Sequence, residues 1–82
     1  MRNPYSLELI IRFWAAFDAL RRKNGRGFLK EFVTEADTNN GNFLRLRNDP
    51  YREFEPYYFK LICDYGVNPH WLITGRGEMF LK

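Results

Sequence analysis

The sequence is poor in the residues that build covalent cross-links and metal centres, because its 82 residues include one cysteine and one histidine. A single cysteine excludes an internal disulfide. Structural metal sites draw several Cys or His ligands from characteristic spacings, and no such spacing is present. We therefore expect no metal and no cofactor, and a core that is held together by side-chain packing.

Long apolar runs are also missing. No stretch approaches the ~20 apolar residues of a membrane-spanning helix. The N-terminal segment is interrupted by Glu8, Arg12 and Asp18, and it does not resemble a secretory signal. These absences predict that the protein has no membrane partner and is intracellular, in the cytoplasm.

A catalytic set is missing as well. Cys63 lies in an apolar context and His70 lies beside Trp71, but nothing in the sequence supplies a third group to orient a Cys63–His70 pair. Without an acid–base set or an activated nucleophile, we expect a protein that is not an enzyme and has no small-molecule substrate. A deep pocket that joined Cys63 to His70 would reopen that possibility.

Aromatic residues are what the chain has in abundance, with eight Phe, five Tyr and two Trp. Large rings fill a small core efficiently, which matters because a chain of this length buries only somewhat over ~60% of its unfolded surface. Apolar residues recur at helical spacing, and strand signals are weak. The sequence predicts a single all-α domain over residues 1–82, folded as a compact five-helix bundle.

The predicted helices cover residues 7–23, 28–35, 40–48, 56–65 and 69–74. Ser6 and Asn39 are the expected N-caps of the first and third helices, and Gly66 closes the fourth. Asp37, in the turn before the third helix, is a residue type that tolerates the left-handed conformation. The side chains expected to face the core are Ile10, Phe13, Trp14, Phe17, Leu20, Phe28, Leu29, Phe32, Val33, Phe43, Leu46, Phe59, Ile62, Cys63 and Tyr65, with Tyr58 in part.

The first helix carries more apolar residues than one inward stripe needs. Leu7, Ile11 and Ala15 widen the stripe. Two interpretations remain open: the helix is deeply buried, or the surplus forms a surface for self-association.

The net charge of +3 permits a polyanionic partner without requiring one. Its distribution is uneven. Basic residues gather in an early cluster between residues 21 and 30 and in a middle cluster formed by Arg45, Arg47 and Arg52. Each cluster is either a solvated surface or a contact for a partner.

Two segments together resemble a known family. Residues 65–80 read as a helix end, an Asn68 cap, Pro69 at the first helical position, a short apolar helix and a glycine stop. Residues 32–49 read as two short helices joined by a tight turn. The closing segment is similar to the GV-N-x-x-WLLTG-x-G ending of helix-turn-helix domains of the lambda-repressor (XRE, Cro-like) type, and the resemblance covers about residues 28–80.

The resemblance implies a lambda-repressor-like bundle in which residues 40–48 form the recognition helix. In that case Arg45 can pair with guanine, Asn40 can pair with adenine, and Leu44 can contact a thymine methyl. Asn39 matches a position that meets a phosphate. The DNA-binding residues implied by the resemblance are Asn39, Asn40, Asn42, Leu44, Arg45, Asn48 and Arg52.

The implied function is sequence-specific binding of double-stranded DNA by a phage or bacterial transcriptional regulator. The resemblance also implies a homodimer on a two-fold operator whose half-sites lie about 34 Å apart. The alternative is a protein-interaction module that has the same fold but does not bind DNA, with the aromatic surplus of the first helix as its contact surface. A positive surface around Arg45, Arg47 and Arg52 would favour DNA, and an apolar one around Leu44 would favour a protein.

Overall fold

The computed structural model describes residues 4–48 and 55–81, and within them the chain is all-α, as predicted. The only β-type pairing in the described residues is an isolated bridge between Val67 and Phe80. No helix in this part of the chain has the length and apolar character needed to cross a membrane. The elements are α1 (Pro4–Asn24), α2 (Gly27–Glu35), α3 (Asn40–Arg45), the 3-10 turn η1 (Leu46–Asn48), α4 (Pro56–Asp64) and α5 (Pro69–Thr74).

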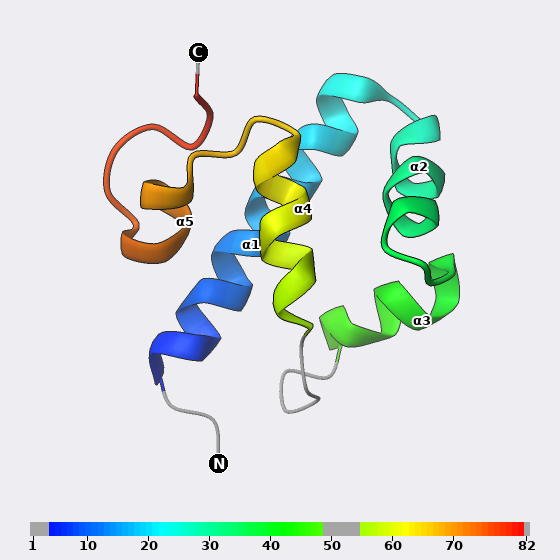
Figure 1. Ribbon diagram of the computed structural model, residues 1–82, viewed down its shortest axis with the longest axis horizontal. Helices are drawn as coiled ribbons and strands as arrows, with labels where there is room; N and C mark the ends of the chain where they lie inside the picture. Colours follow the sequence, from blue (N-terminus) through cyan, green and yellow to red (C-terminus); the bar gives the residue numbers. More distant parts are fainter. Residues whose placement is uncertain (1–3, 49–54, 82) are drawn as a thin grey trace.

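The long helix α1 forms the spine of the bundle (Figure 1). It contacts α2, α4 and α5, whereas α3 contacts α2. In Figure 1, α4 crosses in front of α1, with α2 and α3 to its right and α5 to its left. The pair formed by α2 and α3 therefore lies on the opposite side of the spine from α5.

The start of α1 differs from the prediction. The helix begins at Pro4, so Ser6 lies within its first turn and is not its N-cap. Proline is favoured at the first positions of a helix because its missing N–H has no partner there to lose. The end agrees with the prediction, since α1 stops at Asn24 and Gly25 follows with a positive φ of 84°.

The core is a cluster of aromatic rings. Phe13, Phe17, Phe32 and Phe43 are all fully buried. The ring of Phe43 lies 5.1 Å from that of Phe17 and 5.2 Å from that of Phe32, measured between centroids. Every residue of α1 and α2 that was predicted to face the core is buried there, which confirms the inward stripes of both helices.

The inward face of α4 was predicted only in part, because Ile62 is buried as expected and Tyr58 more than expected, whereas Leu61, which was not predicted to face the core, is buried as well. The predicted face also included Phe59, Cys63 and Tyr65, which pack against the core but are only partly buried. The packing of α4 across α1 turns the face of Tyr58 and Leu61 inward, and Phe59 and Cys63 line a groove beside α5.

Asn68 organises the C-terminal segment. Its side-chain oxygen accepts a hydrogen bond from the His70 N–H (3.0 Å), and its side-chain nitrogen donates to the Glu78 carbonyl (3.0 Å). Its backbone N–H donates to the Met79 carbonyl (2.8 Å). One residue thus caps α5, as predicted, and also holds the returning chain against the start of that helix.

The other end of α5 is closed by Gly75 and by Arg12 of α1. Gly75 adopts the left-handed conformation with φ 79°. Arg12 donates from Nε to the Leu72 carbonyl (2.6 Å) and from Nη2 to the Ile73 carbonyl (2.7 Å). These carbonyls are among those that a helix leaves without internal partners, so the guanidinium joins α5 to the spine. The residues that carry the family resemblance therefore have a structural role here.

Candidate nucleic-acid interface

A tight turn joins α2 to α3. The N–H of Asp37 donates to the Thr34 carbonyl (3.2 Å), and the N–H of Thr38 donates to the Val33 carbonyl (2.9 Å). Together with the left-handed φ of 58° at Asp37, these bonds form the Schellman arrangement that ends many helices. The prediction that Asp37 takes this conformation is confirmed, and the chain changes direction within residues 36–39, so that α3 runs across the end of α2 (Figure 1).

The start of α3 is capped by Asn39. Its backbone is extended, and its side-chain oxygen accepts a hydrogen bond from the Asn42 N–H (2.8 Å). The helical segment covers residues 40–48, but its last three residues tighten into η1. Phe43 is the one fully buried side chain of α3, and it seats the helix against Phe17 and Phe32.

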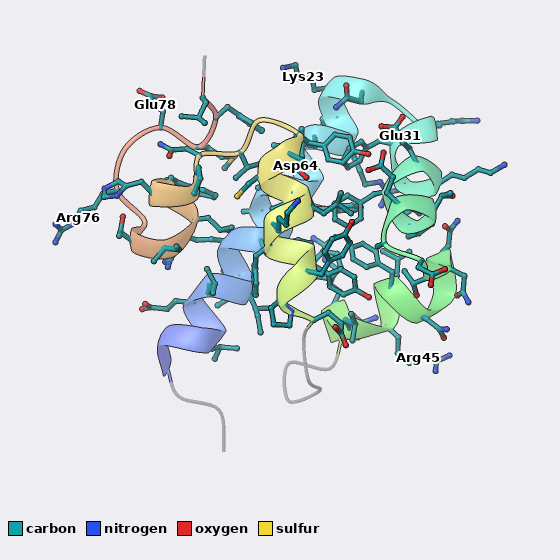
Figure 2. All side chains as sticks on the ribbon, viewed as in Figure 1. Lys23, Glu31, Arg45, Asp64, Arg76 and Glu78 are labelled. Carbon is teal, nitrogen blue, oxygen red and sulfur yellow. The ribbon has the colours of Figure 1, made fainter. Side chains whose placement is uncertain are left out.

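The outer side of this segment is polar. Asn40, Gly41, Asn42 and Arg45 are exposed, as are Asn39 before them and Asn48 after them. Figure 2 shows the Arg45 side chain directed away from the bundle at the lower edge of α3. Leu44 is only partly exposed and packs against the core, so little of it is presented to a partner. Arg52 lies outside the described residues.

Arg47 does not contribute a free charge to this surface. Its two terminal nitrogens donate to the two carboxylate oxygens of Asp18 on α1. Its guanidinium also lies over the ring of Trp14, with Cζ 5.2 Å from the centroid. The hydrogen bond with Asp18 raises the pKa of Arg47 further above its ordinary value. Arg47 therefore ties η1 to α1, and of the three arginines whose contiguous positive surface would favour DNA, only Arg45 is left, within the described residues, to present its charge.

Sequence reasoning missed this Arg47–Asp18 pair. The partners are 29 residues apart, on elements whose relative placement no helical periodicity reveals. The available signal was the aromatic Trp14 one turn before Asp18 on the same helix, since arginine stacks readily on aromatic rings.

The apolar side chains of α1 lie in two environments, the core and the surface. The aromatic residues of α1 whose burial is described, Phe13, Trp14 and Phe17, are buried, so the idea that these three form a contact surface is wrong. Leu7, Ile11 and Ala15, one turn apart, are exposed, with Ile11 61% accessible. Of the two interpretations of these three residues, deep burial is excluded.

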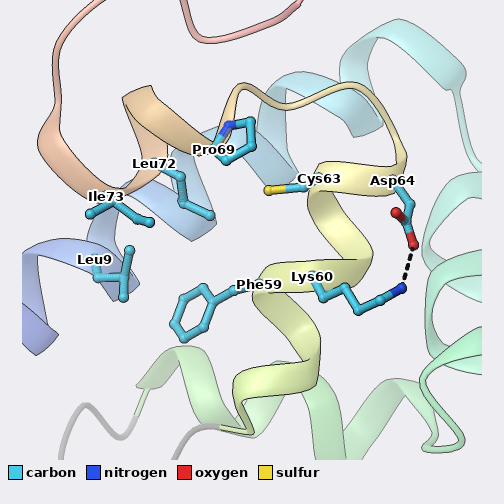
Figure 3. Close-up of a pocket in the computed structure, with 8 residues that line it drawn as sticks. All are labelled: Leu9, Phe59, Lys60, Cys63, Asp64, Pro69, Leu72 and Ile73. Carbon is cyan, nitrogen blue, oxygen red and sulfur yellow. Dashed lines mark hydrogen bonds and ion pairs between the residues drawn. The ribbon is translucent and has the colours of Figure 1, made fainter.

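A groove of about 390 Å³ runs between α1, α4 and α5 (Figure 3). Apolar side chains dominate its lining, and Cys63 is part of it, whereas His70 does not line it. Burial raises the pKa of the Cys63 thiol, and the charge of Asp64 raises it further. The thiol is thus held in its less nucleophilic, protonated form. Within the described residues, no group of three or more His, Cys, Asp or Glu side chains could hold a metal ion.

Comparison of the chain with protein-family models, with curated proteins and with solved structures finds no match. Its function must therefore be inferred from its own residues and their arrangement.

Proposed function

We propose that the protein binds double-stranded DNA in a sequence-specific manner and regulates transcription, as helix-turn-helix domains of the lambda-repressor type do, with α3 as the recognition helix. One observation carries the proposal. A short, capped helix presents exposed amides and an outward arginine, and a tight turn joins it to α2. That arrangement suits the major groove, which admits one helix and offers patterned donors and acceptors on its base edges.

Each exposed side chain has a defined contact in this proposal. The Arg45 guanidinium pairs with the O6 and N7 atoms of a guanine, and the Asn40 amide pairs with the N6 and N7 atoms of an adenine. The side-chain oxygen of Asn39 is already engaged by the Asn42 N–H, so its NH₂ group is the part left to donate to a phosphate. Asn42 and Asn48 flank the groove, and the exposed part of Leu44 meets a thymine methyl.

The proposal includes a homodimer on a two-fold operator. The exposed stripe of Leu7, Ile11 and Ala15 on α1 offers an apolar surface for a second copy of the chain. The same stripe also favours the second candidate function, a protein-interaction module that does not bind DNA. Binding to DNA therefore decides between the two.

Selection from random duplex DNA tests the proposal. The purified protein is mixed with a pool of random duplexes, and the retained fragments are sequenced over several rounds. We expect enrichment of a two-fold symmetric motif with half-sites about 10 base pairs apart, which would support both the reading helix and the dimer. A folded protein that enriches no motif would overturn sequence-specific reading, and one that retains no duplex at all would leave the interaction module.

A further inference from the structure

We infer that the corner between α1 and α2 is a second nucleic-acid surface, which contacts the phosphate backbone and supplies most of the electrostatic attraction for the duplex. The basic corner is defined by Arg21, Arg22, Lys23, Arg26 and Lys30. The inference rests on the proposed function, in that it assigns a different task to a different part of the same DNA-binding protein.

The charge of the chain is concentrated in this corner. Residues 19–30 contain five basic residues and no acidic one. The other eight basic residues are outnumbered by the ten acidic residues, so the rest of the chain carries a net charge of −2. The overall net charge of +3 is therefore produced entirely by the basic corner.

The five charges are available to a partner. All five residues are exposed, and the ion pairs among the described residues, Arg47–Asp18 and Lys60–Asp64, involve none of them. The Arg21 guanidinium lies 6.0 Å from the centroid of the Phe17 ring, and the Lys23 ammonium lies 5.8 Å from that of Phe80. An aromatic ring orients a cation without neutralising it, so Arg21 and Lys23 keep their charges, with Lys23 held beside the C-terminal segment that carries Phe80.

The end of the molecule that carries α3 has no comparable cluster of basic side chains among the described residues. Arg45 is exposed there, but Asp37 is exposed in the adjoining turn, and Asp18 neutralises Arg47. Sequence-independent affinity for DNA comes from cations that displace counterions from phosphates, whereas specificity comes from contacts to base edges. The two tasks are thus separated, with α3 reading bases and the basic corner meeting phosphates.

The distance between the two surfaces fits a duplex. The basic corner lies at the start of α2, and the turn to α3 lies at its end (Figure 1). At 1.5 Å per residue, the nine residues of α2 span about 13 Å. The major groove is about 12 Å wide, so a phosphate strand lies about half that width to either side of a helix seated in it, and the corner, about 13 Å from the turn, lies outside the groove on the side of one such strand. The basic corner is therefore within reach of that strand.

Charge complementarity identifies the phosphate groups of DNA as the ligand of the basic corner. Arginine supplies three of the five cations, and its planar guanidinium binds phosphate oxygens in a bidentate manner. An acidic protein segment has the same sign of charge, so the test includes polyglutamate as a competing probe.

The test compares two variants that remove the same charge. Arg22→Gln/Arg26→Gln alters the basic corner, and Lys60→Gln/Arg76→Gln alters exposed cations elsewhere; Figure 2 shows Arg76 on the far side of the bundle from α2. Binding to a random-sequence duplex of about 30 base pairs is measured by fluorescence anisotropy over a range of salt concentrations. We expect the plot of log K against log salt to lose about two units of slope in the corner variant and none in the control, because each phosphate contact contributes about 0.9.

A charge-preserving variant guards against a change in fold. Arg22→Lys/Arg26→Lys should keep the parental slope, and all variants should keep the parental melting temperature because the altered side chains are exposed. A corner variant with the slope of the control would overturn the inference, even if selection recovers an operator. Binding of polyglutamate, with no binding of duplex, would also overturn it.

The failures of the two proposals are distinguishable. Loss of slope in the corner variant, combined with no enriched motif, would leave the phosphate surface standing and would refute sequence-specific reading by α3. An enriched motif that depends on Arg45, combined with an unchanged slope in the corner variant, would refute the phosphate surface and leave base reading by α3 standing.

Discussion

Asp37 holds the turn between α2 and α3 in a conformation that ordinarily favours glycine. It is the one non-glycine residue with positive φ in the described part of the chain. A left-handed backbone costs an L-residue roughly 1–2 kcal/mol, and somewhat less for Asp. We expect Asp37→Gly to raise the free energy of unfolding by about 0.5–1 kcal/mol, measured by urea denaturation, because glycine accepts this φ without a steric cost.

Asp37→Val is the second variant of this experiment, and it should change the stability in the opposite direction. A β-branched side chain fits the left-handed region worst, so this variant should be less stable than the parent. A destabilising Gly would show that the aspartate makes a contact worth more than the strain of its backbone, and a stabilising Val would show that the left-handed conformation does not limit the stability of this turn.

In the proposed function, Arg45 is the single residue on which base reading depends most. Arg45→Ala should weaken binding to the selected operator by about 1–3 kcal/mol and relax the preference at one base pair, because a bidentate pair with guanine is lost. Arg76→Ala, which removes an equal charge from an exposed loop, is the control in the same titration. If both variants bind the operator equally well, α3 does not dock as proposed.

Cys63 should behave as a protected thiol. Burial raises its pKa, so the thiolate that reacts with iodoacetamide forms only at a higher pH than in an unfolded chain. The pH at which alkylation reaches half its maximal rate should therefore lie higher for the native protein than for the protein in urea. A native rate that rises at lower pH than the unfolded rate would indicate an activated cysteine and would revive the question of catalysis.

At the scale of elements, two of the contacts that attach α3 and η1 to the bundle can be tested separately. Phe43 packs into the aromatic core, and Arg47 binds Asp18 beside Trp14. We expect Arg47→Gln to lower the free energy of unfolding by about 1 kcal/mol, the combined worth of a partly exposed ion pair and a cation–π contact. Thermal unfolding measures this effect, and Arg45→Gln, which alters an outward side chain, should leave it unchanged.

The binding data then separate the two arginines. Arg47→Gln should leave the salt dependence of DNA binding as it is, since a residue paired with Asp18 releases no counterions from phosphates. A slope reduced by about one would place Arg47 on the DNA and contradict its structural role in tying η1 to α1.

The elements also differ in how well their structure could be predicted from the sequence. Caps and turns are local, so Asn39, Asp37 and Gly75 could be assigned from residue type alone, and the inward stripes of α1 and α2 followed from periodicity. The face of α4 could be assigned only in part, because apolar residues occupy most of its circumference and only packing against α1 and α5 selects among them. The Arg47–Asp18 pair depends on the same tertiary placement and was equally hidden.

Across the whole molecule, three tasks occupy three regions. The C-terminal segment, closed by Asn68 and Arg12, holds α5 to the spine. The exposed amides and Arg45 lie on the opposite side of the spine with α3, and the basic corner lies at the far end of α2. The sequence revealed each cluster separately, but the separation of the basic corner from α3 became visible only when α2 was placed between them.

The aromatic core should set the stability of the whole molecule, and Phe13 is its centre. The centroid of its ring lies 5.2–6.5 Å from those of six other rings, namely Trp14, Phe17, Phe32, Phe43, Tyr58 and Phe59. Because these rings come from α1, α2, α3 and α4, a change at Phe13 weakens the contacts among four helices at once.

Phe13→Leu keeps an apolar side chain but removes the ring, and we expect it to lower the free energy of unfolding by about 1–3 kcal/mol. A domain of this size has only about 4–12 kcal/mol in total, so the melting temperature should fall by roughly 5–20 °C. Tyr57→Leu, at an exposed ring, is the matched control and should change little. If the two variants melt together, the rings around Phe13 do not act as one core, and the anchoring of α3 through Phe43 would need another source.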